Sequence, residues 1–490
     1  MNFLIDTNIL IPLEPASAKD LEPVFSLGPD FVRLTQNSGS KIFVHPVIQH
    51  DLDKDKDKDR RALRAKLIKK YNELQAPPGI ERVNDVLSLN PPALSNDWVD
   101  HHLLSAVLNN SIDYLVTEDV KIHSKAEKLG IGSRVLYLFD AIDFLKELFD
   151  VIPETPPSVE VVLAHELNEK ESFFDSLRED YSGFDNWFVK SCKTQHRKCY
   201  VIKPNQVNFQ IAGLCIIKEE DVEPTSGSKA KVLKLCTFKV APEFEGNKYG
   251  ELLLKTIFDY VEVNKYDYTY FTVKEKHQRL MQFASDFGFE KIEHSKEEWI
   301  MLKRFKYSQK ELDGLSALDF HIKFGPFRTR FDTNFSYIIP IKPEYHKVLF
   351  PETSEQHSLW PDEKPCGNSI KKAYLSHSTT NRLKKGDNIF FYRSHDTQGV
   401  TCLGIVEDTL RTKDVNSLAK YVGQRTVYSF NNLKDMCKKE VLAIRFRLVK
   451  KFDFPICIDD LKGNNVIKGS PQSITRIGES IKWLQRQIGM

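Results

Sequence analysis

The sequence lacks any long apolar run. No window of its 490 residues approaches the roughly 18 to 20 uninterrupted apolar residues that a membrane-spanning helix needs, so we expect no membrane association. A basic region followed by an apolar core and a cleavage site is also missing near the N-terminus, which favours a cytoplasmic location. The hydrophobic fraction of 41% and the charged fraction of 28% are ordinary for a soluble globular protein, and this balance excludes a disordered chain.

Cysteine is sparse and scattered. No Cys-x-x-Cys pair and no cluster of His beside Cys occurs, so the spacing argues against a zinc site. The pattern is typical of reduced thiols in an intracellular protein. The eight cysteines stand at 192, 199, 215, 236, 366, 402, 437 and 457.

The charge is unevenly distributed, although the net charge is only +2. Residues 301–490 carry 32 Lys and Arg against 20 Asp and Glu, which is +12, and the remaining 38 against 48 give −10. A basic C-terminal third indicates contact with a polyanion, and RNA or a modified nucleic acid is the expected partner. The alternative is an ordinary basic surface.

The length predicts two to four domains. The proline-rich "VIPETPPSVE" at 151–160 predicts an extended linker. A second change of pattern follows "KEEWIMLKRFKYSQKELDGLS", where a strand-rich region is expected from Phe320 onward. We therefore expect three domains, at 1–150, 158–305 and 318–490, in a multidomain chain of the α/β and α+β classes.

The first 150 residues alternate strand and helix patterns, which predicts a parallel sheet covered by helices. In such sheets, binding sites form beyond the carboxyl ends of the strands. The expected strands are 2–6, 41–45 and 113–117, and the expected helices are 58–74, 99–108 and 141–149.

Acidic residues occur where they could converge beside these strand ends. Neighbouring carboxylates repel one another unless a divalent cation compensates the charge, and their oxygens suit Mg²⁺ or Mn²⁺. Taken singly, each acid also serves as a helix cap or a solvated surface group. The candidates are Asp6, Asp51, Asp100 and Asp119.

The runs "LIDTNIL", "DHHLLSA" and "LVTED", with "AEKLGI" after the last, together resemble the PIN-domain nucleases. The resemblance covers about 140 residues and implies a parallel α/β/α sheet. It implies that Asp6, Asp51, Asp100 and Asp119 are the catalytic metal ligands, with Thr7, Asn8, Thr117 and Glu118 in support. Glu is usual where Asp51 stands, so Asp53 and Asp55 compete for that place, and Asp97 and Glu118 are reserve ligands.

The alternating "DLDKDKDKDRR" that contains Asp51 has two interpretations. Its cations Lys54, Lys56, Arg60 and Arg61 would lie near a substrate phosphate backbone, or the run is a solvated helix face.

Residues 230–293 carry "APEFEGNKYGELLLKTIFDYV" and later "FASDFGFEKI", which resemble the core of the GNAT acetyltransferases. The resemblance implies that a turn opening a helix binds the pyrophosphate of acetyl-CoA, as orphan amides and the helix dipole favour. The implied contacts are Val240, Gly246, Asn247, Lys248, Tyr249 and Gly250.

Three positions depart from the GNAT pattern. Glu245 replaces Gln or Arg, Lys248 replaces a glycine, and Ala284 stands where a general-acid tyrosine is frequent. Two alternatives follow: a GNAT fold that serves as scaffold or acyl-CoA sensor, or an acetyltransferase with a rearranged site.

The C-terminal region contains "SYIIPIKP", "NIFFYRS", "GVTCLGIVED" and "EVLAIRFRLV", separated by turn residues, which predicts a small β-barrel. The stretch "GNSIKKAYLSHSTTNRLKKGDNIFFYRS" resembles the PUA-like class that includes ASCH and EVE domains. The resemblance implies binding of RNA or a modified base. The candidate contacts are Asn368, Ser369, Lys371, Lys372, Ser376, Ser378, Tyr392, Arg393 and Ser394.

The leading hypothesis is a metal-dependent endoribonuclease joined to an acetyl-CoA-type domain and a nucleic-acid reader. Such a protein would suit RNA processing, a growth-arresting toxin restrained by an inhibitory partner protein, or a defence effector. One alternative is an N-acetyltransferase acting on tRNA or protein, with a degraded nuclease domain. Another is a non-catalytic RNA-binding assembly protein.

Overall fold

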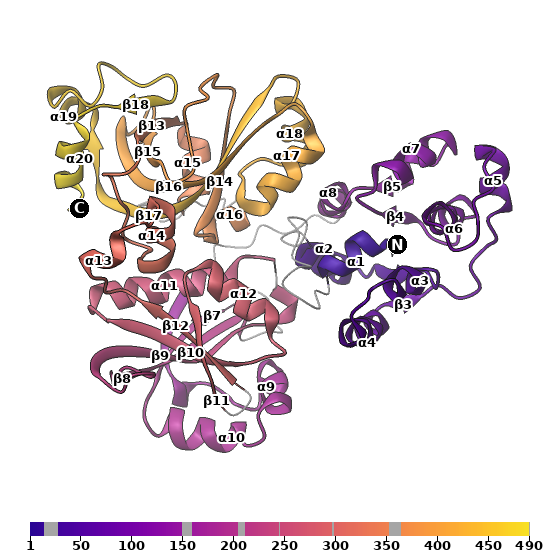
Figure 1. Ribbon diagram of the computed structural model, residues 1–490, viewed down its shortest axis with the longest axis horizontal. Helices are drawn as coiled ribbons and strands as arrows, with labels where there is room; N and C mark the ends of the chain where they lie inside the picture. Colours follow the sequence, from indigo (N-terminus) through magenta and orange to yellow (C-terminus); the bar gives the residue numbers. More distant parts are fainter. Residues whose placement is uncertain are drawn as a thin grey trace. The chain divides into compact units, whose positions relative to one another are not determined.

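The computed structural model describes residues 1–13, 28–148, 159–203, 211–244, 246–295, 298–351 and 364–489. They form three sheets in two compact units (Figure 1). Unit 1 is Met1–Ile152 with Ala419–Gly423 and Ser429–Leu433, and unit 2 is the rest of the chain. Unit 2 contains both the second and the third sheet.

Unit 1 is built on a five-stranded parallel sheet with the order β3-β2-β1-β4-β5. Its strands are β1 Asn2–Ile5, β2 Lys41–Val44, β3 Asn72–Glu73, β4 Tyr114–Val116 and β5 Val135–Leu136. Its helices are α1 Thr7–Leu13, α2 Gly28–Asn37, α3 Ile48–Asp53, α4 Lys58–Leu67, α5 Glu81–Leu87, α6 Asn96–Leu108, α7 Val120–Lys128 and α8 Leu138–Leu148, with 3-10 turns Ile68–Lys70 and Gly132–Arg134.

The predicted parallel sheet of the first domain is confirmed. The strands expected at 2–6, 41–45 and 113–117 are β1, β2 and β4, and β1 is fully buried from Phe3 to Ile5. The helix expected at 58–74 is wrong at its C-terminal end, because the chain leaves the helix after Lys70 and forms β3. Pairing with β2 overrides helix propensity there.

The second sheet has seven strands in the order β11-β12-β10-β9-β8-β7-β6. Only β9 and β10 are parallel; the other neighbours are antiparallel. The strands are β6 Val159–Leu163, β7 Lys198–Ile202, β8 Gly213–Val222, β9 Lys229–Val240, β10 Tyr268–Lys274, β11 Glu290–Ser295 and β12 Glu298–Arg304. All but two residues of the predicted linker 151–160 lie outside the described residues, and Val159 and Glu160 begin β6.

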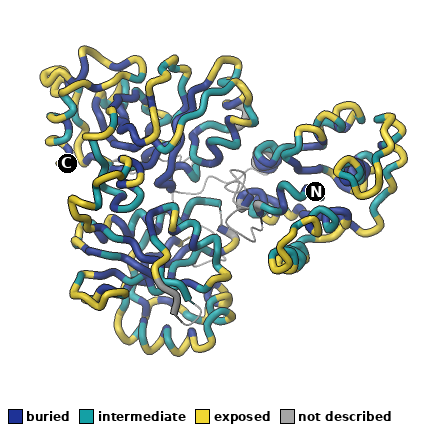
Figure 2. The backbone as a smooth tube through the Cα atoms, viewed as in Figure 1, coloured by how far each residue is buried: buried dark blue, intermediate teal, exposed yellow. Residues whose placement is uncertain are grey.

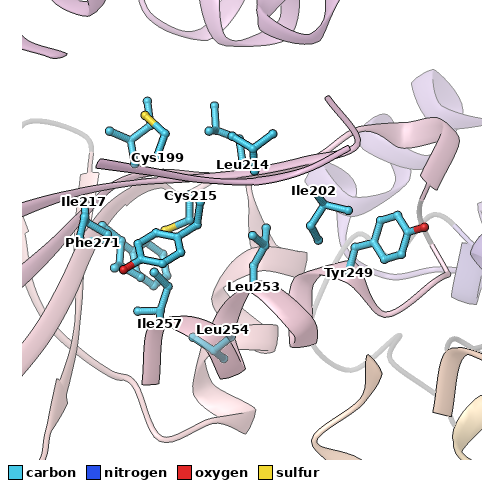
Figure 3. Packing of buried hydrophobic residues seen from close by; sticks show 14 of the residues in the cluster. Cys199, Ile202, Leu214, Cys215, Ile217, Tyr249, Leu253, Leu254, Ile257 and Phe271 are labelled. Carbon is cyan, nitrogen blue, oxygen red and sulfur yellow. The ribbon is translucent and has the colours of Figure 1, made fainter. Parts of the chain in front are cut away.

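Helices connect and cover these strands. They are α9 Asp175–Asp180, α10 Phe184–Trp187, α11 Tyr249–Val263 and α12 Gln278–Asp286, with short turns Ala164–Glu166, Ser172–Phe174 and Pro242–Phe244 and a π-helical segment Phe188–Lys193. Figure 3 shows Leu253 and Ile257 of α11 against the strand face that carries Cys215, in an extensive apolar cluster. This apolar stripe fixes the start of α11 beside the end of β9.

The third sheet has six strands in the order β14-β17-β16-β15-β13-β18. They are β13 Ser336–Ile341, β14 Lys371–Ser376, β15 Asn388–Arg393, β16 Gly399–Thr412, β17 Val441–Cys457 and β18 Thr475–Ile477. The helices are α13 Gln309–Leu312, α14 Ala317–Phe324, α15 Pro343–Leu349, α16 Pro365–Asn368, α17 Val415–Val422, α18 Phe430–Met436, α19 Ile458–Gly463 and α20 Ile481–Gln487, with a turn Gly423–Arg425.

The strand-rich start expected at Phe320 is wrong, because Phe320 lies in α14. Ser316 caps this helix by accepting a hydrogen bond from Asp319 N at 3.1 Å, and its apolar side chains are buried. The four quoted strand segments are confirmed as β13, β15, β16 and β17. Within the described ranges β14 and β18 end the ladder, and closure into a small β-barrel stays a prediction.

Each sheet carries its own buried layer (Figure 2). Within unit 2 the apolar cluster of the second sheet extends to Ile370, which precedes β14. The boundaries of the three predicted domains stay predictions, since the second and third sheets belong to one compact unit.

Candidate functional site

The neighbouring strands β9 and β10 separate along their length. Backbone pairing joins Val232 to Tyr268 and Lys234 to Tyr270, and in the described residues no pairing between the two strands continues beyond. The second half of β9, 235–240, and residues 271–274 of β10 therefore present facing backbone edges. Such edges suit an extended ligand with amide groups of its own.

The open strand ends are bordered by residues 173–180. The ammonium of Lys239 on β9 donates to Ser176 Oγ at 2.7 Å and to the carbonyl of Phe173. The ammonium of Lys274 on β10 donates to the carbonyl of Asp180. One segment is thus hydrogen-bonded to the C-terminal ends of both strands.

The turn predicted to bind a pyrophosphate follows β9 and opens α11. Gly246 has φ 94° and Lys248 has φ 59°, both left-handed, and α11 begins at Tyr249. The first four N–H groups of any helix lack partners within it and favour an anion. Glu245 lies outside the described residues.

The residues predicted to contact the coenzyme differ in burial and in contacts. Gly246, Asn247 and Lys248 are half-buried in the turn, and Val240 is half-buried at the end of β9. A Cβ on Gly250 would touch the rings of Phe283 and Phe238 at 3.5 and 4.0 Å.

Two other positions face the interior of this domain. Tyr249 is buried and stacks on Phe244 with ring centroids 6.1 Å apart, so its ring belongs to the core. Ala284 on α12 is also buried, and its methyl group supplies no proton donor at the place where a tyrosine is frequent in the GNAT pattern.

A residue that the sequence analysis missed, Glu251, lies in the first turn of α11. Its carboxylate accepts hydrogen bonds from Ser369 Oγ at 2.7 Å, Ile370 N at 2.8 Å and Lys371 N at 3.1 Å. Burial by itself raises the pKa of Glu251, but nearby Lys248 and Arg425 with these hydrogen bonds outweigh it, and the pKa is lowered. In sequence Glu251 resembles an ordinary first-turn acid, and only the long-range contact distinguishes it.

In unit 1, Asp6 follows β1 and Thr117 follows β4, the strand beside it. Asp6 Oδ2 accepts from Thr117 Oγ1 and from Asn8 Nδ2, both at 2.7 Å, and Asp6 Oδ1 accepts from Thr7 N at 2.6 Å. Burial, with the negative charges of Asp100 and Asp119, outweighs the lowering by the hydrogen bonds from Thr117 and Thr7. Together these effects raise the pKa of Asp6 to about 6.

The remaining predicted ligands lie around this acid. Asp119 caps α7 by accepting from Lys121 N at 2.7 Å, and Thr7 Oγ1 lies 3.4 Å from Asp51 Oδ2. Asp100 on α6 lies 2.7 Å from the ammonium of Lys125 on α7, which also contacts Asp97 at 2.6 Å.

The supporting residues named from the sequence have mixed roles. Asn8 joins the two strand ends, since its side chain also accepts from Glu118 N at 3.2 Å. Glu118 itself accepts from Leu138 N at 3.0 Å and so caps the start of α8. In "DLDKDKDKDRR", Asp55 pairs with Arg60 of the same run and with Arg64, which lies beyond it in α4. Lys54 pairs with Asp51 at 2.7 Å.

These acids fit a Mg²⁺ or Mn²⁺ ion by donor chemistry, since all are carboxylates and Asp100 and Asp119 are close enough to Asp6 to repel its charge. They do not form a preformed cage: among the described residues no group of three or more His, Cys, Asp or Glu side chains is arranged to hold a metal. Lys125 supplies the compensating charge at Asp100. A metal would have to displace that ammonium.

The nucleic-acid contacts predicted in the C-terminal domain divide into two groups. Asn368, Ser369, Lys371, Lys372 and Tyr392 are buried, at most 7% exposed, and each has a hydrogen-bond partner within the chain. These side chains are therefore not available to a nucleic acid in this conformation. The remaining four, Ser376, Ser378, Arg393 and Ser394, are partly exposed.

All eight cysteines are free thiols. Burial raises the pKa of Cys192 and of Cys199 to about 12, which keeps both protonated. Arg197 Nη1 lies 3.2 Å from the sulfur of half-buried Cys236.

Comparison with known protein families gives a match in the residues of the second sheet. Residues 161–289 match the acetyltransferase (GNAT) family, so this part of the chain is a GNAT acetyltransferase domain. No curated protein matches the sequence.

Solved structures with ASCH and GNAT domains are structural neighbours of parts of the chain. The ASCH protein of Zymomonas mobilis is 18% identical, with 32% of this chain and 94% of that chain covered and a TM-score of 0.25. A GNAT family acetyltransferase from Elizabethkingia anophelis with acetyl-CoA bound is 11% identical, with 30% and 97% covered and a TM-score of 0.22.

No helix in the described ranges combines the length and the apolar character needed to cross a lipid bilayer. The cytoplasmic location stays a prediction.

Proposed function

We propose that the GNAT domain binds acetyl-CoA and transfers its acetyl group to an amine of a tRNA or a protein. The observation that carries the proposal is the separation of β9 from β10 directly before a helix N-terminus, in residues that match the GNAT family. This is the alternative function inferred from the sequence, and it fits these findings better than the nuclease does.

The two halves of the site suit the two halves of acetyl-CoA. The facing edges of β9 and β10 offer backbone N–H and C=O groups to the two amides of the pantetheine arm. The turn 246–248 and the start of α11 offer N–H groups and a helix dipole to the pyrophosphate, and the ammonium of Lys248 adds positive charge.

The reaction would be a direct acyl transfer. The amine nitrogen attacks the thioester carbonyl, a C–N bond forms, the C–S bond breaks, and the CoA sulfur leaves with the proton released by the amine. Because Ala284 offers no proton, water or the amine's own surroundings would carry that proton. We therefore expect a rate that depends on the pKa of the acceptor amine.

Calorimetric titration of the full chain with acetyl-CoA tests binding, and incorporation of labelled acetyl groups into tRNA and protein mixtures tests transfer. Micromolar to submillimolar binding with label transfer is the expected result. Binding without transfer would identify the domain as an acyl-CoA sensor. Absence of binding at millimolar acetyl-CoA would exclude both.

A second proposal concerns unit 1, as a metal-dependent endoribonuclease of the PIN type. The observation that favours it is the parallel sheet order β3-β2-β1-β4-β5, which brings Asp6 and Asp119 to neighbouring strand ends, with Asp100 within electrostatic range. Bound Mg²⁺ or Mn²⁺ would activate a water for attack on a phosphodiester. Asp6, Asp51, Asp100 and Asp119 would hold the ion, and Thr7, Asn8 and Thr117 would orient Asp6 by hydrogen bonds.

Cleavage of a generic RNA in Mg²⁺ or Mn²⁺ tests this second proposal. Asp6→Asn and Asp100→Asn should abolish cleavage, whereas Asp85→Asn, at an exposed site on α5, should cleave as wild type does. Undiminished cleavage by the first two variants would show that the activity does not come from these acids. If all forms are inactive, unit 1 is a substrate cradle or an assembly module.

The RNA partner is a proposal that rests on charge. Four basic side chains are exposed in the described loop before β15, where they could contact phosphates. They are His377, Arg382, Lys384 and Lys385. Replacing the last three by alanine should weaken RNA binding and flatten its dependence on salt concentration. Unchanged affinity and salt slope would remove this loop from the interface.

A further inference from the structure

Four consecutive residues of the C-terminal domain, 368–371, contact the GNAT domain at three points; we call them the clamp segment. Asn368 Nδ2 donates to the carbonyl of Asn247 at 3.1 Å. Ser369 Oγ and the next two backbone amides donate to the carboxylate of Glu251. The ammonium of Lys371 lies 2.6 Å from Asp286 Oδ2.

The three contact points surround the turn proposed to bind the coenzyme. Asn247 belongs to that turn, Glu251 to the first turn of α11, and Asp286 to the last turn of α12. Phe283 of the same helix α12 lies against Gly250. The clamp segment therefore fixes the turn and both helices that flank it.

The turn needs such support because of its backbone. Lys248 has φ 59°, a conformation that is costly for any residue with a Cβ and persists only where the surroundings hold it. Asn247, the residue before it, is the one whose carbonyl the clamp segment holds. Loss of that contact would remove one of the restraints that hold this backbone conformation.

The charge of Glu251 is a second reason why the turn needs the clamp segment. Glu251 is in the first turn of a helix whose N-terminus would receive a pyrophosphate, where an uncompensated carboxylate would repel the ligand. Three donors of the clamp segment bind this buried carboxylate. Its charge is stabilised by nearby Lys248 and Arg425 together with these hydrogen bonds.

We propose that the clamp segment positions the coenzyme-binding turn, so that the affinity of the GNAT domain for acyl-CoA depends on the C-terminal domain. Glu251 and Ser369 act as positioning residues, because their hydrogen bond joins the first turn of α11 to the clamp segment. This inference rests on the proposed acyl-CoA function, and it assigns to residues 368–371 a role in place of direct nucleic-acid contact.

The test uses the full chain and CoA as the probe. Ser369→Ala removes a hydrogen bond to the buried carboxylate of Glu251, and Glu251→Gln removes the charge that strengthens three such bonds. In both variants the Kd for CoA should rise about tenfold or more. KM for acetyl-CoA should rise with it, whereas kcat should change less. Ser473→Ala, at an exposed position of the same domain, should bind CoA as wild type does.

Hydrogen–deuterium exchange without ligand tests the positioning of the turn independently of acyl-CoA binding. In Ser369→Ala and Glu251→Gln the amides of 246–254 should exchange faster than in wild type, while those of β7 and β8 stay unchanged. If wild type binds no CoA, the acyl-CoA function is wrong, and faster exchange still supports positioning. Wild-type affinity and wild-type exchange in both variants would overturn the inference.

If Glu251→Gln does not fold, Asn368→Ala is a less disruptive variant for the same test. It removes the side-chain contact to Asn247, so the exchange of the turn should increase and the circular dichroism spectrum should remain that of wild type. Unchanged exchange in this folded variant would also contradict the proposed positioning.

Discussion

The hydroxyl of Thr117 donates a 2.7 Å hydrogen bond to the carboxylate of Asp6, which lies 111 residues earlier in the chain. The bond joins the ends of β4 and β1, two neighbouring parallel strands. It holds a buried acid at the edge of the sheet where such folds place their sites.

Asp6 should make the stability of unit 1 depend on pH. Because burial raises its folded pKa to about 6, above the unfolded value of 3.8, folding is favoured by protonation of Asp6. Its contribution is full below pH 3.8 and is lost as the pH rises through 6, by up to about 3 kcal/mol. Asp6→Asn removes this dependence, so the Tm of wild type relative to the variant should fall between about pH 4 and pH 7.

The comparison is made by calorimetry of both proteins at several pH values with a chelator present, and Asp85→Asn is the control for a surface carboxylate. A Tm difference between wild type and Asp6→Asn that stays constant with pH would show that Asp6 has an ordinary pKa.

Gly288 should tolerate no side chain. Its φ is +83°, and a Cβ there would lie 1.8 Å from the carbonyl oxygen of Ile322 and 2.7 Å from Lys303 Nζ. Gly288→Ala should lower the free energy of unfolding by more than about 2 kcal/mol, measured by urea denaturation of the full chain. The clash would push α14 away from the turn after α12.

Gly314→Ala is the matched control, because Gly314 has φ +80° and no heavy atom lies within 4 Å of the place that an added Cβ would take. It should cost about 1 kcal/mol, the conformational term alone. Equal losses in the two variants would mean that the contact with Ile322 does not matter.

Lys303 should make stability depend on pH in the opposite direction from Asp6. It is 1% exposed on β12, lies 5.6 Å from the ring centroids of Phe258 and Phe305, and donates to the carbonyl of Ile322 at 2.8 Å. Burial, with repulsion from Arg447, lowers the pKa of Lys303 to about 7 from 10.5. Its contribution to stability is therefore full above pH 10.5 and is lost as the pH falls toward 7.

Lys303→Met keeps the length of the side chain and removes the titration. The variant should gain stability relative to wild type as the pH is lowered from about 10 to 7, followed by urea denaturation. Lys306→Met, at an exposed lysine nearby, should show no such trend. A parallel pH profile for wild type and Lys303→Met would contradict the lowered pKa.

Gly250→Ala should preserve coenzyme binding. The added methyl group would point at Phe283 and Phe238 at ordinary contact distance, 3.5 to 4.0 Å, and the backbone there is helical. We expect a Kd for CoA within about threefold of wild type, and a gain of up to about 1 kcal/mol from helix propensity. Calorimetry and denaturation measure the two quantities; loss of binding would place the ligand between Gly250 and these rings.

Local patterns in the sequence locate much of the fold. The apolar run before Asp6 and the one before Thr117 predict β1 and β4, since a buried parallel strand is an uninterrupted apolar segment. The run that ends at Val240, followed by a glycine-bearing turn, predicts the order of strand, turn and helix at β9 and α11. The expectation at Phe320 fails because "ALDFHIKF" is short, so its helical period is weak and the cap at Ser316 is the main sign of a helix.

The sequence does not predict the contacts of the clamp segment or of Lys372, which follows it. Lys371 and Lys372 look like surface cations in a basic region, yet they are 6% and 0% exposed and bind Asp286 and the carbonyl of Cys366. Their acceptors come from tertiary contact, and no local pattern contains that information.

By itself, the sequence determined the alternation of strands and helices in unit 1, the GNAT-like turn and the basic C-terminal third, because periodicity, turn residues and charge are local properties. The tertiary structure decided that Asp6 is buried beside Thr117, that β9 and β10 separate, and that Glu251 is bound by Ser369. These depend on strand order and on contacts between residues far apart in the chain. Burial and long-range hydrogen bonding, which fix pKa values and availability to a ligand, arise only when the chain is folded.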